Sequence, residues 1–172
     1  RPNTAYVPQR FERLEVKAGR TLDVVLEEGI VLSGRVTDAD GNPVGQAYVH
    51  AGDQDKSDGD EGFANTERDG TYRMPLSAGV YDVTAEPPDG SGLLRATASA
   101  VQLTAPRTLN FQLTKGLILS GRVTGPDGQG LFDARINVFK PQTGEWYGTQ
   151  TRRDGTYLLA LPPGAYGLRA EP

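Results

Sequence analysis

Residues 22–37 read LDVVLEEGIVLSGRVT, and residues 109–124 read LNFQLTKGLILSGRVT. The two segments share the pattern LxxxLxxGxxLSGRVT at an offset of 87 positions (109 − 22). A match of this length at one fixed offset indicates an internal repeat. The chain therefore contains two related copies of one structural unit.

Two further matches extend the repeat toward the end of each copy. The sequence RDGTY at residues 68–72 returns at residues 153–157, an offset of 85 positions (153 − 68). The pattern GxYxxxAEP at residues 79–87 returns at residues 164–172 with the same offset. The second copy is therefore two residues shorter, and the loss falls opposite the segment between Ala51 and Phe63 of the first copy, where an acidic segment stands.

Apolar and polar residues alternate along short segments of each copy. This period of two is typical of strands with one buried face. Asp-Gly pairs at residues 40–41, 69–70, 127–128 and 154–155 favour tight turns between those segments, and no long segment has helical periodicity. We therefore predict an all-β fold of tandem antiparallel β-sandwich repeats with Greek-key, prealbumin-like or immunoglobulin-like topology. The predicted inward-facing sets are Leu109, Phe111 and Leu113; Ala134, Ile136 and Val138; Tyr157, Leu159 and Leu161; Tyr166, Leu168 and Ala170; Tyr72, Met74 and Leu76; and Tyr81, Val83 and Ala85.

A family resemblance rests on two longer stretches. SGRVTDADGNPVGQAYV at residues 33–49 and TERDGTYRMPLSAGVYDVTA at residues 66–85 resemble the carboxypeptidase regulatory-like (transthyretin-like) domain. The corresponding stretches of the second copy are SGRVTGPDGQGL and TRRDGTYLLALPPGAYGLRA. In the first of them, Gly125 and Gly130 stand where the family usually has Asp and Pro. The resemblance covers nearly the whole chain from Leu22 onward. It implies an accessory or spacer module of secreted and cell-surface proteins, with no activity of its own.

The composition of the chain limits the classes of partner that it is expected to bind. No apolar run approaches the roughly 20 residues that span a bilayer, so we expect no membrane span. The net charge is −4, and the Lys and Arg residues are scattered without interleaved aromatics, so we expect no nucleic-acid partner. The chain has no cysteine, which excludes disulfides and thiol chemistry but does not indicate a cellular compartment. Because Met74 is the only methionine, we expect sequence upstream of Arg1.

The residues give no support for catalysis. His50 is the only histidine, and it is out of phase with the predicted inward-facing residues Ala47, Val49 and Ala51, so we expect it at the surface. No pair of carboxylates is marked as a general acid and base. We therefore expect a protein that is not an enzyme and has no organic cofactor.

An intramolecular isopeptide bond is a second covalent possibility, because residues 79–90 resemble the final hairpin of pilin domains that form one. That chemistry requires a buried lysine on an early strand. The corresponding strands carry Arg35 and Arg122 instead, and a guanidinium cannot act as the amine. Lys115 lies at a strand edge and has no equivalent in the first copy. We expect no such bond.

The acidic segment HAGDQDKSDGDEG at residues 50–62 has two open interpretations. Its oxygen-bearing side chains suit Ca²⁺, which binds six to eight oxygen ligands. However, the spacing departs from a calcium-binding EF-hand loop, because Gly59 comes one position late and no Glu stands twelve residues from the first Asp. The other interpretation is a solvated acidic insertion. The candidate calcium ligands are Asp53, Asp55, Ser57, Asp58 and Asp60.

A set of aromatic residues occurs only in the second copy. Phe139, Trp146 and Tyr147 flank a turn at residues 141–144, and Phe132 precedes them. Exposed aromatics can stack on sugars or anchor a protein partner. Ordinary cross-strand packing around a hairpin is the alternative. Phe139, Trp146 and Tyr147 are therefore candidate residues for a glycan or protein ligand.

The repeat boundaries suggest a mode of assembly. We expect a first complete repeat at residues 29–115 and a second at residues 116–172 that has no counterparts of the last two strands of the first. Residues 1–28 instead match those closing strands. Residues 4–28 of one chain are therefore predicted to complete residues 117–172 of the next, head to tail. Alternatively, the chain is a window of a longer array with the same contacts inside one polypeptide. The matched residues are Leu14, Val16, Arg20, Thr21, Leu22 and Leu26, which correspond to Val101, Leu103, Arg107, Thr108, Leu109 and Leu113.

The sequence thus predicts a non-enzymatic structural repeat segment of an extracellular surface or filament protein. Its expected partners are neighbouring repeats or copies of itself. The alternative is an accessory module of a secreted multidomain protein that binds calcium, a glycan or another protein. Copy-specific features favour this alternative, and the near-identical framework favours the structural role.

Overall fold

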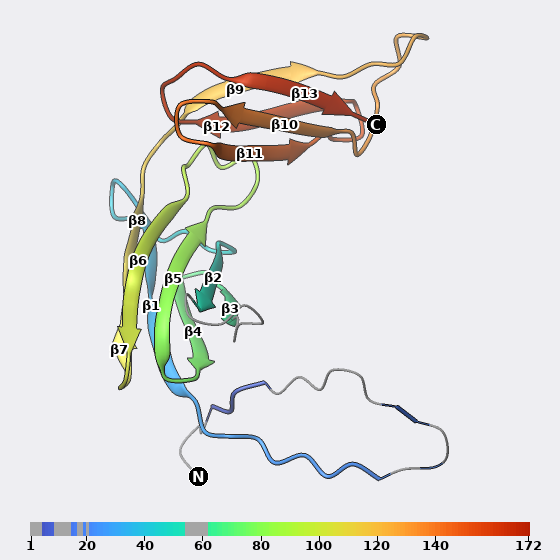
Figure 1. Ribbon diagram of the computed structural model, residues 1–172. Coiled ribbons are helices and arrows are strands. Elements are labelled where there is room, and N and C mark those ends of the chain that lie inside the picture. Colours follow the sequence, from blue (N-terminus) through green and yellow to red (C-terminus); the bar gives the residue numbers. More distant parts are fainter. Residues whose placement is uncertain (1–4, 9–14, 17–18, 20, 54–61) are drawn as a thin grey trace.

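The computed structural model describes residues 5–8, 15–16, 19, 21–53 and 62–172. These residues form strands and turns without a helix, in two β-sandwiches stacked end to end (Figure 1). The predicted all-β fold is confirmed. Over the same residues, no helix is long and apolar enough to cross a membrane.

The first sandwich is built from two facing sheets. One has the order β4-β1-β7, with β8 also on β1, and the other has the order β3-β2-β5-β6. The first contains β1 (Ile30–Asp38), β4 (Thr71–Leu76), β7 (Arg107–Thr108) and β8 (Phe111–Leu113). The second contains β2 (Tyr48–Asp53), β3 (Gly62–Asn65), β5 (Gly79–Glu86) and β6 (Ala96–Leu103).

One pairing in this sandwich departs from the antiparallel pattern. β7 and β8 both run parallel to β1, whereas the other pairs are antiparallel. The chain leaves β6 in one sheet and crosses to the other sheet, where it runs beside β1 in the same direction. The closing strands therefore cover one edge of β1, and β4 covers the other.

The core of the first sandwich lies between its sheets. It is formed by the side chains that the alternation of apolar and polar residues predicts to face inward. His50, which lies out of phase with that face, is only partly buried and stacks on Tyr48 with ring centroids 6.4 Å apart. The largest fully buried side chains come from both sheets and from the closing strand β8: Leu32, Val36, Val49, Met74, Leu76, Tyr81, Val83, Leu103 and Leu113.

The second sandwich repeats this plan with fewer strands among the described residues. Its sheets have the orders β12-β9 and β11-β10-β13. The described residues hold no counterparts of β6, β7 and β8, whose side chains fill the first core. The bounds are β9 (Leu117–Arg122), β10 (Arg135–Lys140), β11 (Glu145–Gln150), β12 (Thr156–Leu161) and β13 (Gly167–Glu171).

This difference leaves apolar side chains of the second sandwich open. Leu168 is 50% exposed, whereas its counterpart Val83 is 0% exposed. Ala170 is also exposed, so the predicted burial of the set around β13 holds only in part. The face was predicted to be buried from its alternation, but alternation does not show whether a covering strand is present. Ile136, Val138 and Leu161 form the small core that remains.

The two sandwiches share their turn chemistry. Gly70 and Gly155 adopt positive φ angles of 79° and 81°, which confirms these predicted Asp-Gly turns. Asp69 Oδ1 accepts hydrogen bonds from the amide and hydroxyl of Thr71, and Asp154 accepts the same pair from Thr156. The two repeats are therefore alike at the level of individual hydrogen bonds, and they differ where β7 and β8 lie in the first.

Candidate functional site

The edge of β1 shows how a repeat receives its closing strands. Ser33 lies opposite Thr108, and the amide of Leu109 donates a 2.7 Å hydrogen bond to the Ser33 carbonyl. On the same side, the amide of Arg35 donates a 2.9 Å hydrogen bond to Asn110 Oδ1. The incoming segment is thus held through both backbone and side-chain groups.

Gly34 and Tyr72 complete this edge. The segment crosses so close to Gly34 that a Cβ there would overlap the Leu109 carbonyl, so only glycine fits. The Tyr72 hydroxyl donates a 2.7 Å hydrogen bond to that carbonyl. Burial raises the pKa of Tyr72 well above its ordinary value of 10.0, so the hydroxyl keeps its proton and remains a donor.

The corresponding edge of the second sandwich, which we call the β9 edge, consists of Leu119, Gly121, Val123 and Tyr157. It has the same residue types at Gly121 and Tyr157 as the β1 edge has at Gly34 and Tyr72. Among the described residues, β9 pairs only with β12, and nothing accepts a hydrogen bond from the Tyr157 hydroxyl. The atoms nearest to a Cβ on Gly121 would be those of the Tyr157 side chain, at 2.7–2.8 Å. Within the described residues, the β9 edge thus shares its glycine and tyrosine with the β1 edge and has no further strand paired to it.

The junction between the sandwiches is the second site that the structure brings together. The amide of Leu94 donates a 2.8 Å hydrogen bond to the Thr114 carbonyl, and the amide of Gly116 donates a 3.0 Å bond to Gly92. Both bonds join the loop between β5 and β6 to the linker that leads into β9. The linker is therefore part of a small ordered structure.

Arg95 adds side-chain contacts across the junction. Its guanidinium lies 5.0 Å from the centroid of the Tyr147 ring and donates a 3.4 Å hydrogen bond to the Trp146 carbonyl. The same group lies 3.9 Å from a Glu145 carboxylate oxygen. A cleft of about 200 Å³ lies beside these contacts, lined by residues 86–95 and by parts of β11 and β12. The junction thus combines a cation–π contact with a weak ion pair.

The charges at this junction influence each other. A hydrogen bond from the Thr143 hydroxyl lowers the pKa of Glu145, and Arg95 and Lys140 lower it further. Burial raises the pKa of Tyr147, and the neighbouring Glu145 adds to that shift. At neutral pH, Glu145 is therefore a carboxylate facing a cation and a neutral phenol.

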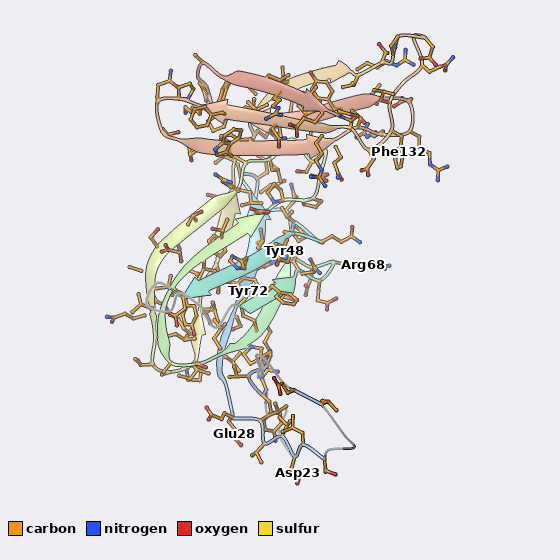
Figure 2. The ribbon with its side chains drawn as sticks, turned by 45° about the vertical axis from the view of Figure 1, so that its right-hand side comes forward. Asp23, Glu28, Tyr48, Arg68, Tyr72 and Phe132 are labelled. Atoms are coloured by element: carbon orange, nitrogen blue, oxygen red, sulfur yellow. The ribbon has the colours of Figure 1, made fainter. Side chains whose placement is uncertain are left out.

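The candidate ligand residues do not form one aromatic surface. Phe139 and Trp146 are cross-strand partners with ring centroids 4.8 Å apart, and Trp146 is 60% exposed. Tyr147 points to the other face of β11, packs against the core and meets Tyr166 edge-on at 6.1 Å. Phe132 lies apart, on the turn between β9 and β10 (Figure 2). Phe139 and Trp146 therefore lie together on one face of the sheet, whereas Tyr147 packs on the other, and a glycan or protein ligand for these residues remains a prediction.

The candidate calcium ligands remain a prediction. Asp53 ends β2, whereas Asp55, Ser57, Asp58 and Asp60 lie outside the described residues. In the part of the chain that the structure describes, no group of three or more His, Cys, Asp or Glu side chains could hold a metal ion.

Sequence reasoning missed two elements of these sites. Gly34 and Gly121 stand in the repeated LSGRVT motif, and their invariance between copies was a signal of close backbone approach. Arg95 gave no such signal, because it lies beyond residues 79–87, the last stretch of the first copy that is matched to the second.

No curated protein matches the sequence. Several solved structures show a likeness at low identity, among them the following three. The Bacillus anthracis TIE protein is 16% identical, with 84% of this chain and 28% of that chain covered and a TM-score of 0.39. A streptococcal ancillary pilin is 16% identical, with 99% and 63% covered and a TM-score of 0.38. Fervidolysin from Fervidobacterium pennivorans, a keratinolytic enzyme related to subtilisin, is 20% identical, with 81% and 24% covered and a TM-score of 0.42.

The chain thus spans less than two thirds of the length of each of these three proteins. The carboxypeptidase regulatory-like domain matches it over two segments, residues 31–114 and 118–172. These segments coincide with the two sandwiches and together exceed half of the chain. The chain belongs to the carboxypeptidase regulatory-like domain family, which it represents with two tandem repeats.

Proposed function

We propose that the chain is a non-catalytic structural segment of an extracellular surface or filament protein, in which stacked sandwiches supply length and stiffness. The observation that carries this proposal is the ordered junction, in which backbone hydrogen bonds tie Thr114 and Gly116 to the loop of the first sandwich. Strand complementation between neighbouring copies would extend the same stack.

A stiff junction is what a spacer requires. A flexible Gly/Ser linker would let the two sandwiches reorient freely, and the stack would have no defined length. Here the linker of residues 114–116 is short and is hydrogen-bonded to the loop of the first sandwich. Arg95 also contacts β11 of the next sandwich. Membership of the carboxypeptidase regulatory-like domain family supports the same role, because it implies an accessory or spacer module of a secreted or cell-surface protein. The extracellular location rests on this support.

The proposal can be tested by measuring the distance between the two sandwiches. The chain has no cysteine, so Gln102→Cys on β6 and Gln150→Cys on β11 give two exposed sites for spin labels. Double electron–electron resonance should return one narrow distance distribution. Arg95→Ala should broaden it, and Arg153→Ala, which removes an exposed arginine elsewhere, should not. A broad distribution in the otherwise unaltered chain would reject the spacer role.

A ligand-binding accessory module is the second candidate function. Trp146, which is 60% exposed and packs against the half-buried Phe139, favours it, because an exposed aromatic face on an outer sheet face can stack on a sugar ring. A glycan array and a calcium titration of the intact chain separate the two candidates. A pure spacer gives no signal in either, whereas glycan binding that Trp146→Ala abolishes would establish a binding role.

A further inference from the structure

We propose that the β9 edge binds residues 21–26 of a second copy of this chain as a parallel strand, in the place that residues 108–113 occupy on β1. This inference rests on the proposed structural role and names the residues that would join one copy to the next. It is argued from the first sandwich, where the same type of segment lies on the same type of edge.

The acceptor has the features that the first sandwich uses. In β1, a Cβ at position 34 would overlap the Leu109 carbonyl of the closing segment and would also lie 2.9 Å from the Tyr72 ring. In β9, Gly121 occupies the equivalent position, and the described atoms nearest to a Cβ there belong to the Tyr157 side chain. Leu168 is 50% exposed, whereas its counterpart Val83 is buried in the first core, so an apolar strand would gain burial there. The β9 edge is thus preformed for a strand that the described residues do not supply.

The donor has the matching sequence. Residues 21–26 read TLDVVL and residues 108–113 read TLNFQL. Leu22, Val24 and Leu26 correspond to Leu109, Phe111 and Leu113, which pack into the first core. In this chain those three donor residues are exposed, so their apolar face is available. Val25 is 82% exposed and corresponds to Gln112, which points outward on β8.

The polar groups also match. Asp23 corresponds to Asn110, whose Oδ1 accepts from the Arg35 amide, and a carboxylate oxygen can accept in the same way from the Arg122 amide. The Leu22 carbonyl would then lie where the Leu109 carbonyl lies, within reach of the Tyr157 hydroxyl. The docked segment would give this hydroxyl the acceptor that Tyr72 already has.

The donor and acceptor of one chain lie at opposite ends of the molecule. Figure 1 places the segment before β1 at one end and the second sandwich at the other, and Figure 2 shows Asp23 and Glu28 on that distant segment. A chain therefore cannot fill its own β9 edge without large rearrangement. Docking between copies is therefore head to tail, and each added copy presents a further β9 edge, so assembly continues beyond a dimer.

Sedimentation of the full chain over a range of concentrations tests this inference. The unaltered chain should associate into species larger than a dimer. Leu22→Asp combined with Leu26→Asp should weaken association by at least about a hundredfold, because two charges enter an apolar site. Val25→Asp is the matched control, since it adds the same charge on the outward face, and it should leave association unchanged.

A mixing experiment distinguishes docking from unspecific aggregation. Gly121→Ala blocks the acceptor, and in the free chain the atoms nearest to its added methyl belong to the Tyr157 side chain, which must shift to make room. The Gly121→Ala chain and the Leu22→Asp/Leu26→Asp chain should each be monomeric, whereas their mixture should form a 1:1 heterodimer. A synthetic peptide of residues 19–29 should likewise bind the double variant at 1:1, which tests the acceptor without any folding change in the donor.

An unaltered chain that stays monomeric at high concentration, a mixture that forms no heterodimer, or a peptide that does not bind would each overturn the inference. The distance distribution between the sandwiches is measured within one chain, so it reports on the spacer role independently. A narrow distribution together with absent association would reject strand docking and leave the proposed function in place.

Discussion

The hydroxyl of Tyr72 donates a 2.7 Å hydrogen bond to the carbonyl of Leu109, which lies 37 residues later in the chain. This bond joins β4 to the closing segment across β1. Its counterpart Tyr157 has the same position on β12, but no described residue accepts a hydrogen bond from it. Within the described residues, the two repeats thus share their framework, and a closing segment lies only on the first.

Removal of the Tyr72 hydroxyl should destabilise the first sandwich. Tyr72→Phe leaves the Leu109 carbonyl without this donor, and we expect the free energy of unfolding to fall by about 1–2 kcal/mol. Tyr157→Phe is the matched control and should change the free energy of unfolding of a dilute, monomeric chain very little. Urea unfolding of both variants measures the difference. Equal losses would show that the Leu109 contact is not what stabilises Tyr72.

The close approach over Gly34 gives a second prediction. Gly34→Ala places a methyl group where the Leu109 carbonyl lies, and backbone cannot move away as a flexible side chain can. We expect a loss of about 3 kcal/mol or more in the free energy of unfolding of the first sandwich. Thermal unfolding would measure this loss. A Gly34→Ala chain as stable as the parent would mean that the closing segment does not cross at this point.

The turn at Asp154 predicts a defined response to pH. The Thr156 hydroxyl and amide lower the pKa of Asp154 below its ordinary value of 3.8. Because the folded pKa is the lower one, this carboxylate stabilises the fold above about pH 4 and loses that effect as the pH falls through the folded pKa. Thr156→Val removes the hydroxyl donor, so the pKa should rise toward 3.8. A carboxyl titration by NMR checks this, and an unchanged pKa in the variant would exclude the hydroxyl as its main cause.

The calcium hypothesis predicts an effect on the first sandwich only. If the segment from Asp53 to Glu61 binds Ca²⁺, millimolar Ca²⁺ should raise the melting temperature of the first sandwich, because ligand binding to the folded state stabilises it. The equivalent stretch of the second copy, residues 140–145, carries one acid and one base. Calorimetry with Asp53, Asp55 and Asp58 replaced by Ala tests the site. A shift that survives these replacements would place the calcium elsewhere.

The framework of the fold follows from local patterns in the sequence. The alternation from Tyr72 to Leu76 and from Tyr81 to Ala85 predicts buried faces correctly, because both sheets of the first sandwich are complete around them. The same alternation fails in part at Leu168, since burial depends on a covering strand far away in the fold. The parallel course of β7 and β8 beside β1 was likewise not visible in the residues, because direction is set by the crossing between sheets.

The candidate sites were less predictable than the fold. Trp146 and Tyr147 are neighbours in sequence and were predicted to bind one ligand together, but strand geometry directs them to opposite faces. Arg95 became visible only when the fold brought its loop against β11. By contrast, the match between residues 21–26 and 108–113 was readable from the sequence, and the structure shows what such a segment does on the β1 edge.

Register-specific cross-linking tests the docking of one copy on the next most directly. Ser33 pairs with Thr108, so the equivalent contact between copies joins Ser120 to Thr21. A chain carrying Thr21→Cys and Ser120→Cys should form a ladder of disulfide-linked multimers under mild oxidation. The control chain with Thr21→Cys and Ser33→Cys should form no ladder, because Thr108 already occupies the place beside Ser33. A ladder confined to the first chain is the predicted result, and equal ladders or none in either chain would contradict the account.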